Sequence, residues 1–206
     1  MFISVQSQTS CISDSDDDVI GHIQRGESKA ALHHLVKQYR VGVYRYCCSL
    51  LSDPVLADDV CQQIFIQAFR DLSQFRERST IRIWLFAIAR HRVLDAARAR
   101  HRAQARQQDF PAAEPVDTRL SPAESLDEMR LREALMRSLE RLDDRIRSAM
   151  LLRYQQGFTF QEMAAICQEK PGTLAARVTR ALPLLRADIE SRIRSLPERT
   201  AHQRTA

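Results

Sequence analysis

Glycine is scarce in this chain: its 206 residues include only five. This scarcity excludes collagen-like repeats and glycine-rich linkers, and neither phosphate-cradling motif, GxGxxG or GxxxxGK[ST], occurs. No apolar run approaches the roughly 18 residues that a membrane-spanning helix needs. The start, MFISVQSQTSCISDSDDD, has no basic stretch followed by an apolar core, so it does not resemble a secretion signal. We therefore expect a cytoplasmic protein without membrane insertion.

Cysteine is also sparse, and its spacing excludes the usual cysteine chemistries. The five cysteines form no CxxC pair, which argues against a disulfide framework and against a zinc site. Most are expected to be small buried residues; a redox or metal sensor built on the adjacent Cys47 and Cys48 is the alternative. No HExxH motif or nucleophile–histidine arrangement occurs, so we expect neither an enzyme nor a bound cofactor or metal.

Charge changes sign along the chain. Residues 1–18 contain four aspartates and no base, whereas residues 70–106 contain ten arginines against three acids. Residues 107–128 hold six acids, one arginine and three prolines, and the segment from 129 to 194 is basic again. Basic segments attract phosphate backbones through counterion release. The acidic, proline-containing stretch between them is typical of a linker that separates two domains.

Apolar periodicity predicts helices and no strands. Apolar residues recur at spacings of three and four over 19–50, which predicts a helix that ends before Pro54. A second helix is predicted over about 54–73, and after a loop a third runs from Ile81 to about Arg102.

The second half of the chain has the pattern of a helix-turn-helix. Regularly spaced leucines predict a helix from 131 that is broken at Gly157. Thr159 and Glu162 form a capping box that opens a short helix over about 160–167, and a three-residue connection leads to Pro171 at the start of the next helix. In a helix-turn-helix that binds DNA, the second helix is the one presented to the major groove, and simple packing of two short helices in a core is the alternative.

These patterns predict an all-α protein of two small helical domains joined by an acidic, proline-containing linker. The second domain contains the helix-turn-helix. The predicted segments are an acidic N-terminal tail (1–18), a first domain (19–106), a flexible linker (107–128), a second domain (129–194) and a disordered tail (195–206).

Three stretches, taken in order, resemble the extracytoplasmic-function (ECF) sigma factors of the sigma-70 family. They are ADDVCQQIF at 57–65, the segment 75–95 that ends in WLFAIARHRVLD, and the segment 152–181 that contains GFTFQEMA and GTL. In that family the first domain binds core RNA polymerase and the −10 promoter element, and the second binds the −35 element. The resemblance implies core RNA polymerase and promoter DNA as partners, and an anti-sigma factor as a regulator.

The resemblance also implies three groups of site residues. Polymerase binding is assigned to polar groups around an aromatic anchor, for which core packing of the anchor is the alternative. The −10 group combines arginines for phosphates with a histidine that can stack on an extruded base. On the second helix of the helix-turn-helix, arginine can bond guanine and the other residues position the protein on phosphate, whereas Leu174 and Val178, like Trp84 in the first domain, are expected in the core. The groups are Asp58, Asp59, Gln62, Gln63 and Phe65 for polymerase; Arg76, Arg78, Ser79, Arg82, His91 and Arg92 for −10 DNA; and Lys170, Thr173, Arg177 and Arg180 for −35 DNA.

The chain departs from the family pattern at several positions. Glu77 stands where the family often has glycine, Ile81 where it has an aromatic residue, and His91 where it has asparagine. In the second domain Gln168 replaces the glycine of the turn. The other departures are Ala175 and Ala176, where side chains commonly meet DNA, and Pro183, which is expected to end or kink its helix.

Two other functions fit parts of the sequence. A helix-turn-helix regulator that acts without polymerase explains the second domain but leaves 54–100 without a role. An all-helical adaptor needs no DNA contacts. Binding to core polymerase separates the sigma factor from both.

Overall fold

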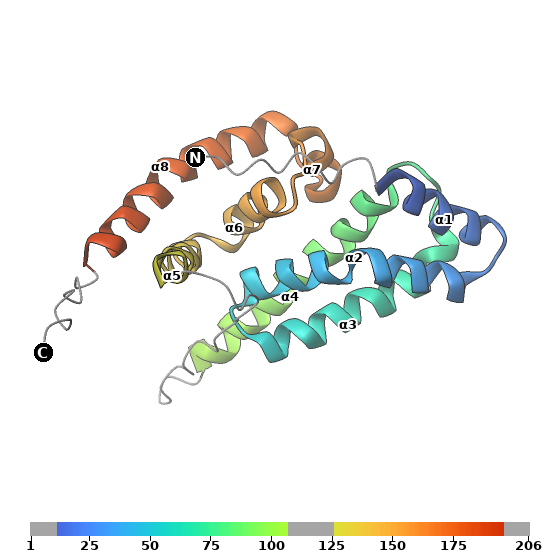
Figure 1. Cartoon of the computed structure of the whole chain (residues 1–206), viewed down its shortest axis with the longest axis horizontal. Coiled ribbons are helices and arrows are strands. Elements are labelled where there is room, and N and C mark those ends of the chain that lie inside the picture. The colour runs from blue at the N-terminus through green and yellow to red at the C-terminus, as the bar shows by residue number, and fades with distance from the viewer. Residues whose placement is uncertain (1–11, 107–125, 196–206) are drawn as a thin grey trace, which may run out of the picture.

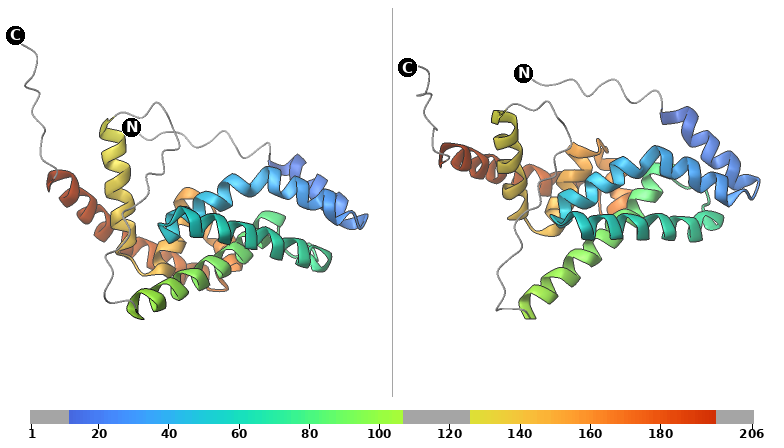
Figure 2. Two further views of the ribbon diagram at one scale, coloured as in Figure 1. Left: turned by 90° about the horizontal axis from the view of Figure 1, so that it is seen from below. Right: turned by 60° about the horizontal axis from the view of Figure 1, so that its bottom comes forward.

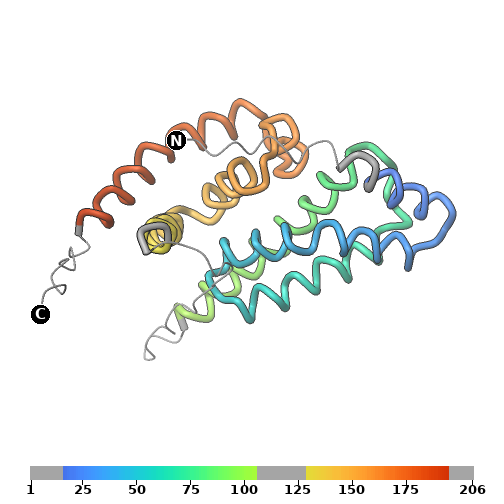
Figure 3. The backbone as a smooth tube through the Cα atoms, in the orientation of Figure 1, coloured from blue at the N-terminus to red at the C-terminus, as the bar shows by residue number. Residues whose placement is uncertain are grey.

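The computed structural model describes residues 12–106 and 126–195, and these described residues contain helices and no strand. The first four helices form one group, in which α2 packs against α1, α3 and α4. The remaining four form a second group, in which α8 packs against α5, α6 and α7. Figure 1 shows the two groups side by side, and Figure 3 follows the chain from one to the other.

In the first group the helix boundaries follow local signals in the sequence. Helix α3 (Pro54–Asp71) starts on a proline, and the Asp53 side chain caps it by accepting hydrogen bonds from the N–H groups of Val55 and Leu56. A short 3₁₀ turn, Leu72–Gln74, follows, and after a loop α4 (Ile81–Arg106) runs four residues beyond its predicted end. In Figure 2 the C-terminal half of α4 projects beyond the other helices of its group.

The prediction of one helix over 19–50 is wrong, because two helices occupy this stretch. Helix α1 (Ile12–Gln24) ends at Gly26, whose φ of +74° is a left-handed conformation that favours glycine. The Glu27 N–H donates to the carbonyl of His22, which closes the helix end as in a Schellman motif. Helix α2 (Ser28–Leu51) then begins in a new direction. Helix α1 also takes in residues 12–18 of the predicted acidic tail, and residues 1–11 lie outside the described residues.

In the second group the predicted periodicity is interrupted earlier than Gly157. Helix α5 (Leu126–Glu140) ends before Asp143, whose side chain accepts the N–H of Arg145 and starts α6 (Asp144–Met150). The break arises because a capping carboxylate competes with continued helix. A π-helical turn (Leu151–Gln155) extends α6 toward Gly157. Helix α5 also occupies 126–128 of the predicted linker, whose other residues, like 196–206 of the predicted tail, lie outside the described part.

The helix-turn-helix is formed by α7 (Phe160–Cys167) and α8 (Pro171–Ser195). Thr159 and Glu162 make the predicted capping box, with the Glu162 N–H 3.2 Å from the Thr159 hydroxyl. Gln168 takes the left-handed conformation (φ +56°) at the end of α7, which explains why this position suits glycine. Pro183 was expected to end or kink its helix, and it does not end it, since α8 continues to Ser195. Pro183 itself is exposed, and buried residues on either side of it, Ala181 and Leu185, hold the helix in place.

One hydrophobic core runs through both groups. It includes Leu35, Ile64 and Leu85 from the first and Leu152 and Met163 from the second, each fully buried. The predicted core residues Leu174 and Val178 are buried as expected. Helix α6 lies against α2 and α4, and α7 lies against α4, so the two domains are docked on each other. Among the described residues, no helix combines the length and apolar character that crossing a bilayer requires.

Candidate functional site

A groove between α2 and α3 contains three of the five residues predicted to bind polymerase. Asp58 and Gln62 lie on one wall, where the Gln62 side-chain amide donates to the Asp58 carboxylate at 2.9 Å. Phe65 is also on the wall, whereas Asp59 and Gln63 are exposed on α3 outside the groove. The full lining is Val36, Arg40, Asp58, Cys61, Gln62, Phe65 and Ile66.

Phe65 is buried, whereas the next residue in the chain, Ile66, is exposed. Phe65 is only 8% exposed and belongs to the core, so its main contact is internal. Ile66 is 51% exposed and Phe69 is 39% exposed, and both lie on the face of α3 that carries Gln62. Exposed large apolar residues beside a groove mark an interaction surface. Sequence reasoning missed Ile66 and Phe69, although their spacing of four and seven from Gln62 was the available signal.

Three cysteines lie near this groove and behave as packing residues. Burial raises the pKa of the Cys61 thiol to about 11 and also raises the pKa values of Cys47 and Cys48. These thiols therefore stay protonated at neutral pH, which lowers their reactivity. Among the described residues, no group of His, Cys, Asp and Glu has the arrangement of a metal site.

The loop before α4 exposes two of the predicted −10 arginines, Arg76 and Arg78. Between them, Glu77 has a φ of +54°, which explains why the position favours glycine. Its carboxylate accepts a hydrogen bond from the Gln24 amide at 2.9 Å, which ties the loop to α1. Ser79 is half-buried and its hydroxyl is 3.4 Å from the carbonyl oxygen of Thr80.

The remaining −10 candidates lie on α4 and point in different directions. His91 is largely exposed and pairs with Asp95 at 3.2 Å. Arg92 donates to the side chain of Gln67 on α3 at 2.6 Å. Arg82 turns toward the second domain, where it donates to the carbonyl of Gln156 and lies over a phenyl ring. The structure thus keeps Arg82 apart from the exposed arginines of the loop.

Trp84, predicted to lie in the core, is half-buried at the edge of it. Its ring meets that of Phe75 edge to face, with 5.5 Å between centroids. This contact fixes the first residue of the −10 loop against α4.

On the helix-turn-helix, three of the four predicted −35 residues are exposed: Lys170, Thr173 and Arg180. The fourth, Arg177, makes a two-pronged ion pair with Glu169, at 3.0 and 2.7 Å. This hydrogen bond lowers the pKa of the Glu169 carboxyl and raises that of Arg177. Arg90 of α4 approaches the same carboxylate at 3.7 Å, so Glu169 links the turn to the first domain.

Comparisons with known proteins show which family the two domains match. The family "Sigma-70 region 2" matches residues 35–103, and "Sigma-70, region 4" matches residues 132–185. The chain is 32% identical to "ECF RNA polymerase sigma factor SigC" of Mycobacterium tuberculosis over 184 residues, which cover 85% of this chain and 94% of that protein. It is 28% identical to "ECF RNA polymerase sigma-E factor" of Escherichia coli, covering 87% and 97%. The fold is similar to that of the sigma factor RpoE in its complex with the anti-sigma factor NepR from Bartonella quintana, with a TM-score of 0.63 and 23% identity over 80% of this chain and 98% of that one.

Proposed function

This chain belongs to the sigma-70 family, in its ECF group of RNA polymerase sigma factors, and on that premise we propose which of its surfaces bind the core enzyme and which bind promoter DNA. A sigma factor binds core RNA polymerase and directs transcription initiation from specific promoters. Members of the sigma-70 family are initiation factors, not catalysts. We place its action in the cytoplasm, where bacterial polymerase and DNA are.

The groove between α2 and α3 is the proposed polymerase-binding surface. The exposed side chains of Gln62 and Ile66, with Phe69 beside them, supply a polar and an apolar contact on one helix face. Mixed surfaces of this kind suit a protein interface that forms and dissociates. Phe65 supports the surface from beneath, and Asp58 orients Gln62 through its hydrogen bond. The proposed partner is the clamp of the largest polymerase subunit.

The loop 75–80 and the exposed side of α4 are the proposed −10 surface. Arg76 and Arg78 are free of the core and available to phosphates, and His91 can stack on an unpaired base. Because Glu77 occupies a left-handed conformation without being glycine, the loop backbone is held in one shape by its neighbours. We therefore expect it to present a preformed pocket for a single-stranded base.

Helix α8 is the proposed −35 reader. Thr173 and Arg180 are exposed on its first three turns and Lys170 is exposed directly before its first residue, so that all three are placed to reach a major groove. Ala175 and Ala176 provide no polar group for a base edge. Most of the binding free energy is then electrostatic, and we expect the −35 sequence to be read loosely.

An anti-sigma factor is the proposed regulator. The support is the similarity in fold to a sigma factor whose structure was solved together with one. The groove on α3 is the surface that such a protein would have to cover to prevent core binding.

Site-specific photocrosslinking tests the assignment of surfaces. A photoreactive residue at Gln62 is expected to crosslink to the largest polymerase subunit, and one at Thr173 to promoter DNA, in the complex with core enzyme. Lys37, which is exposed on α2 outside the groove, is the matched control and is expected to crosslink to neither. Equal crosslinking of polymerase from Gln62 and Lys37 would refute the groove as the core-binding surface. For the regulator, a small protein that co-purifies under repressing conditions must compete with core enzyme for binding; one that does not compete is not an anti-sigma factor.

A further inference from the structure

Three side chains form a hydrogen-bonded chain, here called the Asp71–Gln67–Arg92 relay, between α3 and α4. The Arg92 guanidinium of α4 donates to the side-chain oxygen of Gln67 at 2.6 Å, and the Gln67 amide donates to the Asp71 carboxylate at 2.7 Å. All three residues are half-buried. Within residues 12–106 and 126–195, the Arg92 side chain makes this one hydrogen bond and no ion pair. The acid of the relay is therefore separated from Arg92 by one amide group.

The chemistry of the two ends fixes the orientation of Gln67. An ionised carboxylate only accepts hydrogen bonds, and a guanidinium only donates them. The Gln67 amide must therefore turn its NH₂ group to Asp71 and its oxygen to Arg92. Asp71 lies four residues after Gln67, about one turn further along α3, so that the same helix carries both residues. The oxygen that faces Arg92 is thus held in place by α3 alone.

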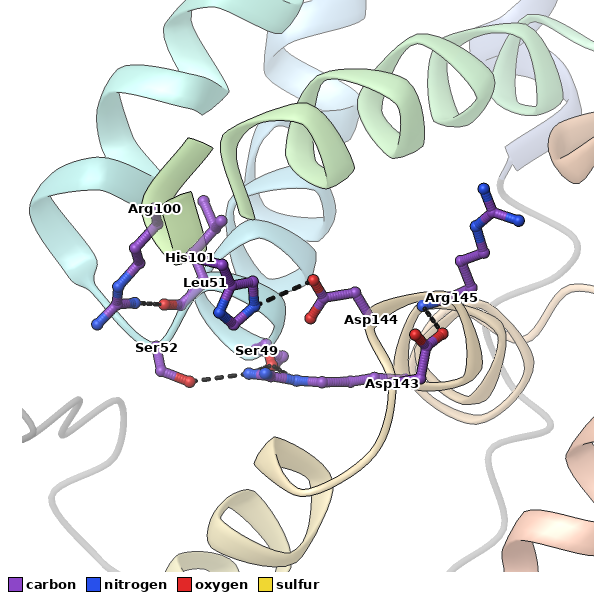
Figure 4. Close-up of polar contacts among 9 residues, drawn as sticks. Ser49, Leu51, Ser52, Arg100, His101, Asp143, Asp144 and Arg145 are labelled. Carbon is purple, nitrogen blue, oxygen red and sulfur yellow. Dashed lines mark hydrogen bonds and ion pairs between the residues drawn. The ribbon is translucent and has the colours of Figure 1, made fainter. Parts of the chain in front are cut away.

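Two basic residues about two turns further along α4 are held differently. His101 pairs directly with Asp144 at 3.2 Å, and Arg100 donates to the backbone carbonyl of Leu51 (Figure 4). A direct ion pair places a carboxylate where it competes with any other anion for the cation. The amide that separates Arg92 from the acid avoids this competition, because the guanidinium is oriented by a neutral acceptor and keeps its full charge.

We propose that Gln67 is a positioning residue for promoter DNA: set by Asp71, it holds one edge of the Arg92 guanidinium and leaves the rest of that group to a DNA phosphate. A guanidinium has five N–H donors, of which the bond to Gln67 uses one. A planar donor group that is oriented in advance loses less side-chain freedom when it binds phosphate. Gln67 acts only through Arg92 and does not itself contact DNA. The proposal rests on the assignment of Arg92 to −10 DNA, and the experiment separates the two.

The test uses four variants that differ in what they do to Arg92. Gln67→Leu removes the acceptor and keeps a side chain of similar size. Gln67→Glu replaces the neutral acceptor by a carboxylate, which can form an ion pair with Arg92. Arg92→Ala removes the cation. Gln74→Glu is the matched control for general repulsion of DNA, because Gln74 is exposed in the 3₁₀ turn that follows α3 and gains the same charge.

The assay is fluorescence anisotropy with the full-length protein bound to core RNA polymerase, over a series of salt concentrations. The probe is a labelled pool of forked DNA, double-stranded upstream and single-stranded with random sequence downstream, because a phosphate contact carries no sequence information. Gln67→Leu is expected to weaken binding by about threefold to tenfold without changing the salt slope, since the charge of Arg92 remains. Gln67→Glu and Arg92→Ala are each expected to weaken binding by about tenfold and to lower the salt slope by about 0.7–0.9. Gln74→Glu is expected to change the affinity by less than about twofold.

A merely structural role predicts the opposite result for Gln67→Glu. If the relay only ties α3 to α4, the new ion pair preserves the tie, and wild-type affinity and salt slope in this variant would overturn the proposal. Wild-type affinity of a Gln67→Leu protein that is folded by circular dichroism would overturn it as well. So would an equal effect of Gln67→Leu with and without Arg92→Ala, because a residue that acts through Arg92 has no effect once Arg92 is removed. If Gln67→Leu does not fold, equal losses in Gln67→Glu and Gln74→Glu would overturn the proposal on their own.

Arg92→Ala separates this proposal from the function proposed above. A weakened Arg92→Ala beside a Gln67→Leu protein of wild-type affinity refutes the positioning role and leaves Arg92 on the DNA surface. Wild-type affinity of Arg92→Ala removes both Arg92 and Gln67 from DNA binding. In that case Arg76→Ala reports on the rest of the −10 surface: weaker binding supports that surface without Arg92, and unchanged binding refutes it.

Discussion

Truncation of Ile66 tests the polymerase-binding groove at the residue that the structure leaves exposed. Complete burial of an isoleucine side chain contributes about 1.5–3 kcal/mol, and Ile66 is 51% exposed, so roughly half of that remains to be gained on binding. Ile66→Ala is therefore expected to weaken binding by about 1 kcal/mol, or about fivefold in Kd. Because the buried half of the side chain also packs in α3, a small loss of thermal stability accompanies it.

The assay is competition for purified core RNA polymerase against fluorescently labelled wild type, followed by anisotropy. Val41→Ala is the matched control, since Val41 is 61% exposed on α2 and does not line the groove. It is expected to leave Kd unchanged. Equal effects of the two substitutions, or an Ile66→Ala protein with wild-type affinity, would contradict the assignment of the groove.

The other predictions concern the core, the turn, DNA binding and pH. Phe65→Ala is expected to lower the free energy of unfolding by about 3 kcal/mol or more, because the ring belongs to the core, and urea unfolding measures this. A variant with wild-type stability that no longer binds polymerase would show instead that Phe65 acts in the interface. Gln168→Gly is expected to raise the free energy of unfolding by up to about 1 kcal/mol, or Tm by about 2–4 °C, because glycine adopts the left-handed conformation without strain. Gln168→Ala is expected to give no gain, and equal Tm values for the two variants would refute the strain. Arg180→Ala is expected to lower the salt slope of promoter binding by about one, and an unchanged slope and affinity would exclude this face from DNA. Because its hydrogen bond with Arg177 lowers the pKa of Glu169, the stability from this pair is present above the ordinary value of 4.5 and lost as pH falls through the lowered one. The Tm difference between wild type and Glu169→Gln should therefore shrink below pH 4.5, and a constant difference would contradict the pair.

Local signals in the sequence predicted the elements that they control directly. Asp53 and Pro54 start α3, and Thr159 with Glu162 starts α7, because a cap is satisfied within four residues of chain. Burial of Leu174 followed from helical spacing for the same reason.

Two breaks between helices were not predicted, because the apolar periodicity continues across them. The break at Gly26 was overlooked, since the apolar spacing of α1 and α2 continues across it, although a single left-handed glycine suffices to end a helix. The capping role of Asp143 was overlooked in the same way.

The docking of the domains lay beyond sequence patterns. Arg82 was assigned to −10 DNA from the family resemblance, but its position is set by Gln156 and Phe158, more than 70 residues away in the chain. Arg147 carries no motif, and only the tertiary structure brings its guanidinium to Ser49. Contacts between distant segments leave no periodic trace in the sequence, which is why the docking of the two domains could be found only in the structure.

Run-off transcription tests the central claim most directly. Purified bacterial core RNA polymerase, this protein and sheared DNA from its own genome are combined, and the 5′ ends of the transcripts are mapped. The account predicts discrete transcripts that depend on the protein and share −10 and −35 elements. The absence of transcripts, together with no co-migration of the protein with core polymerase, would contradict it and favour a helix-turn-helix regulator that acts without polymerase.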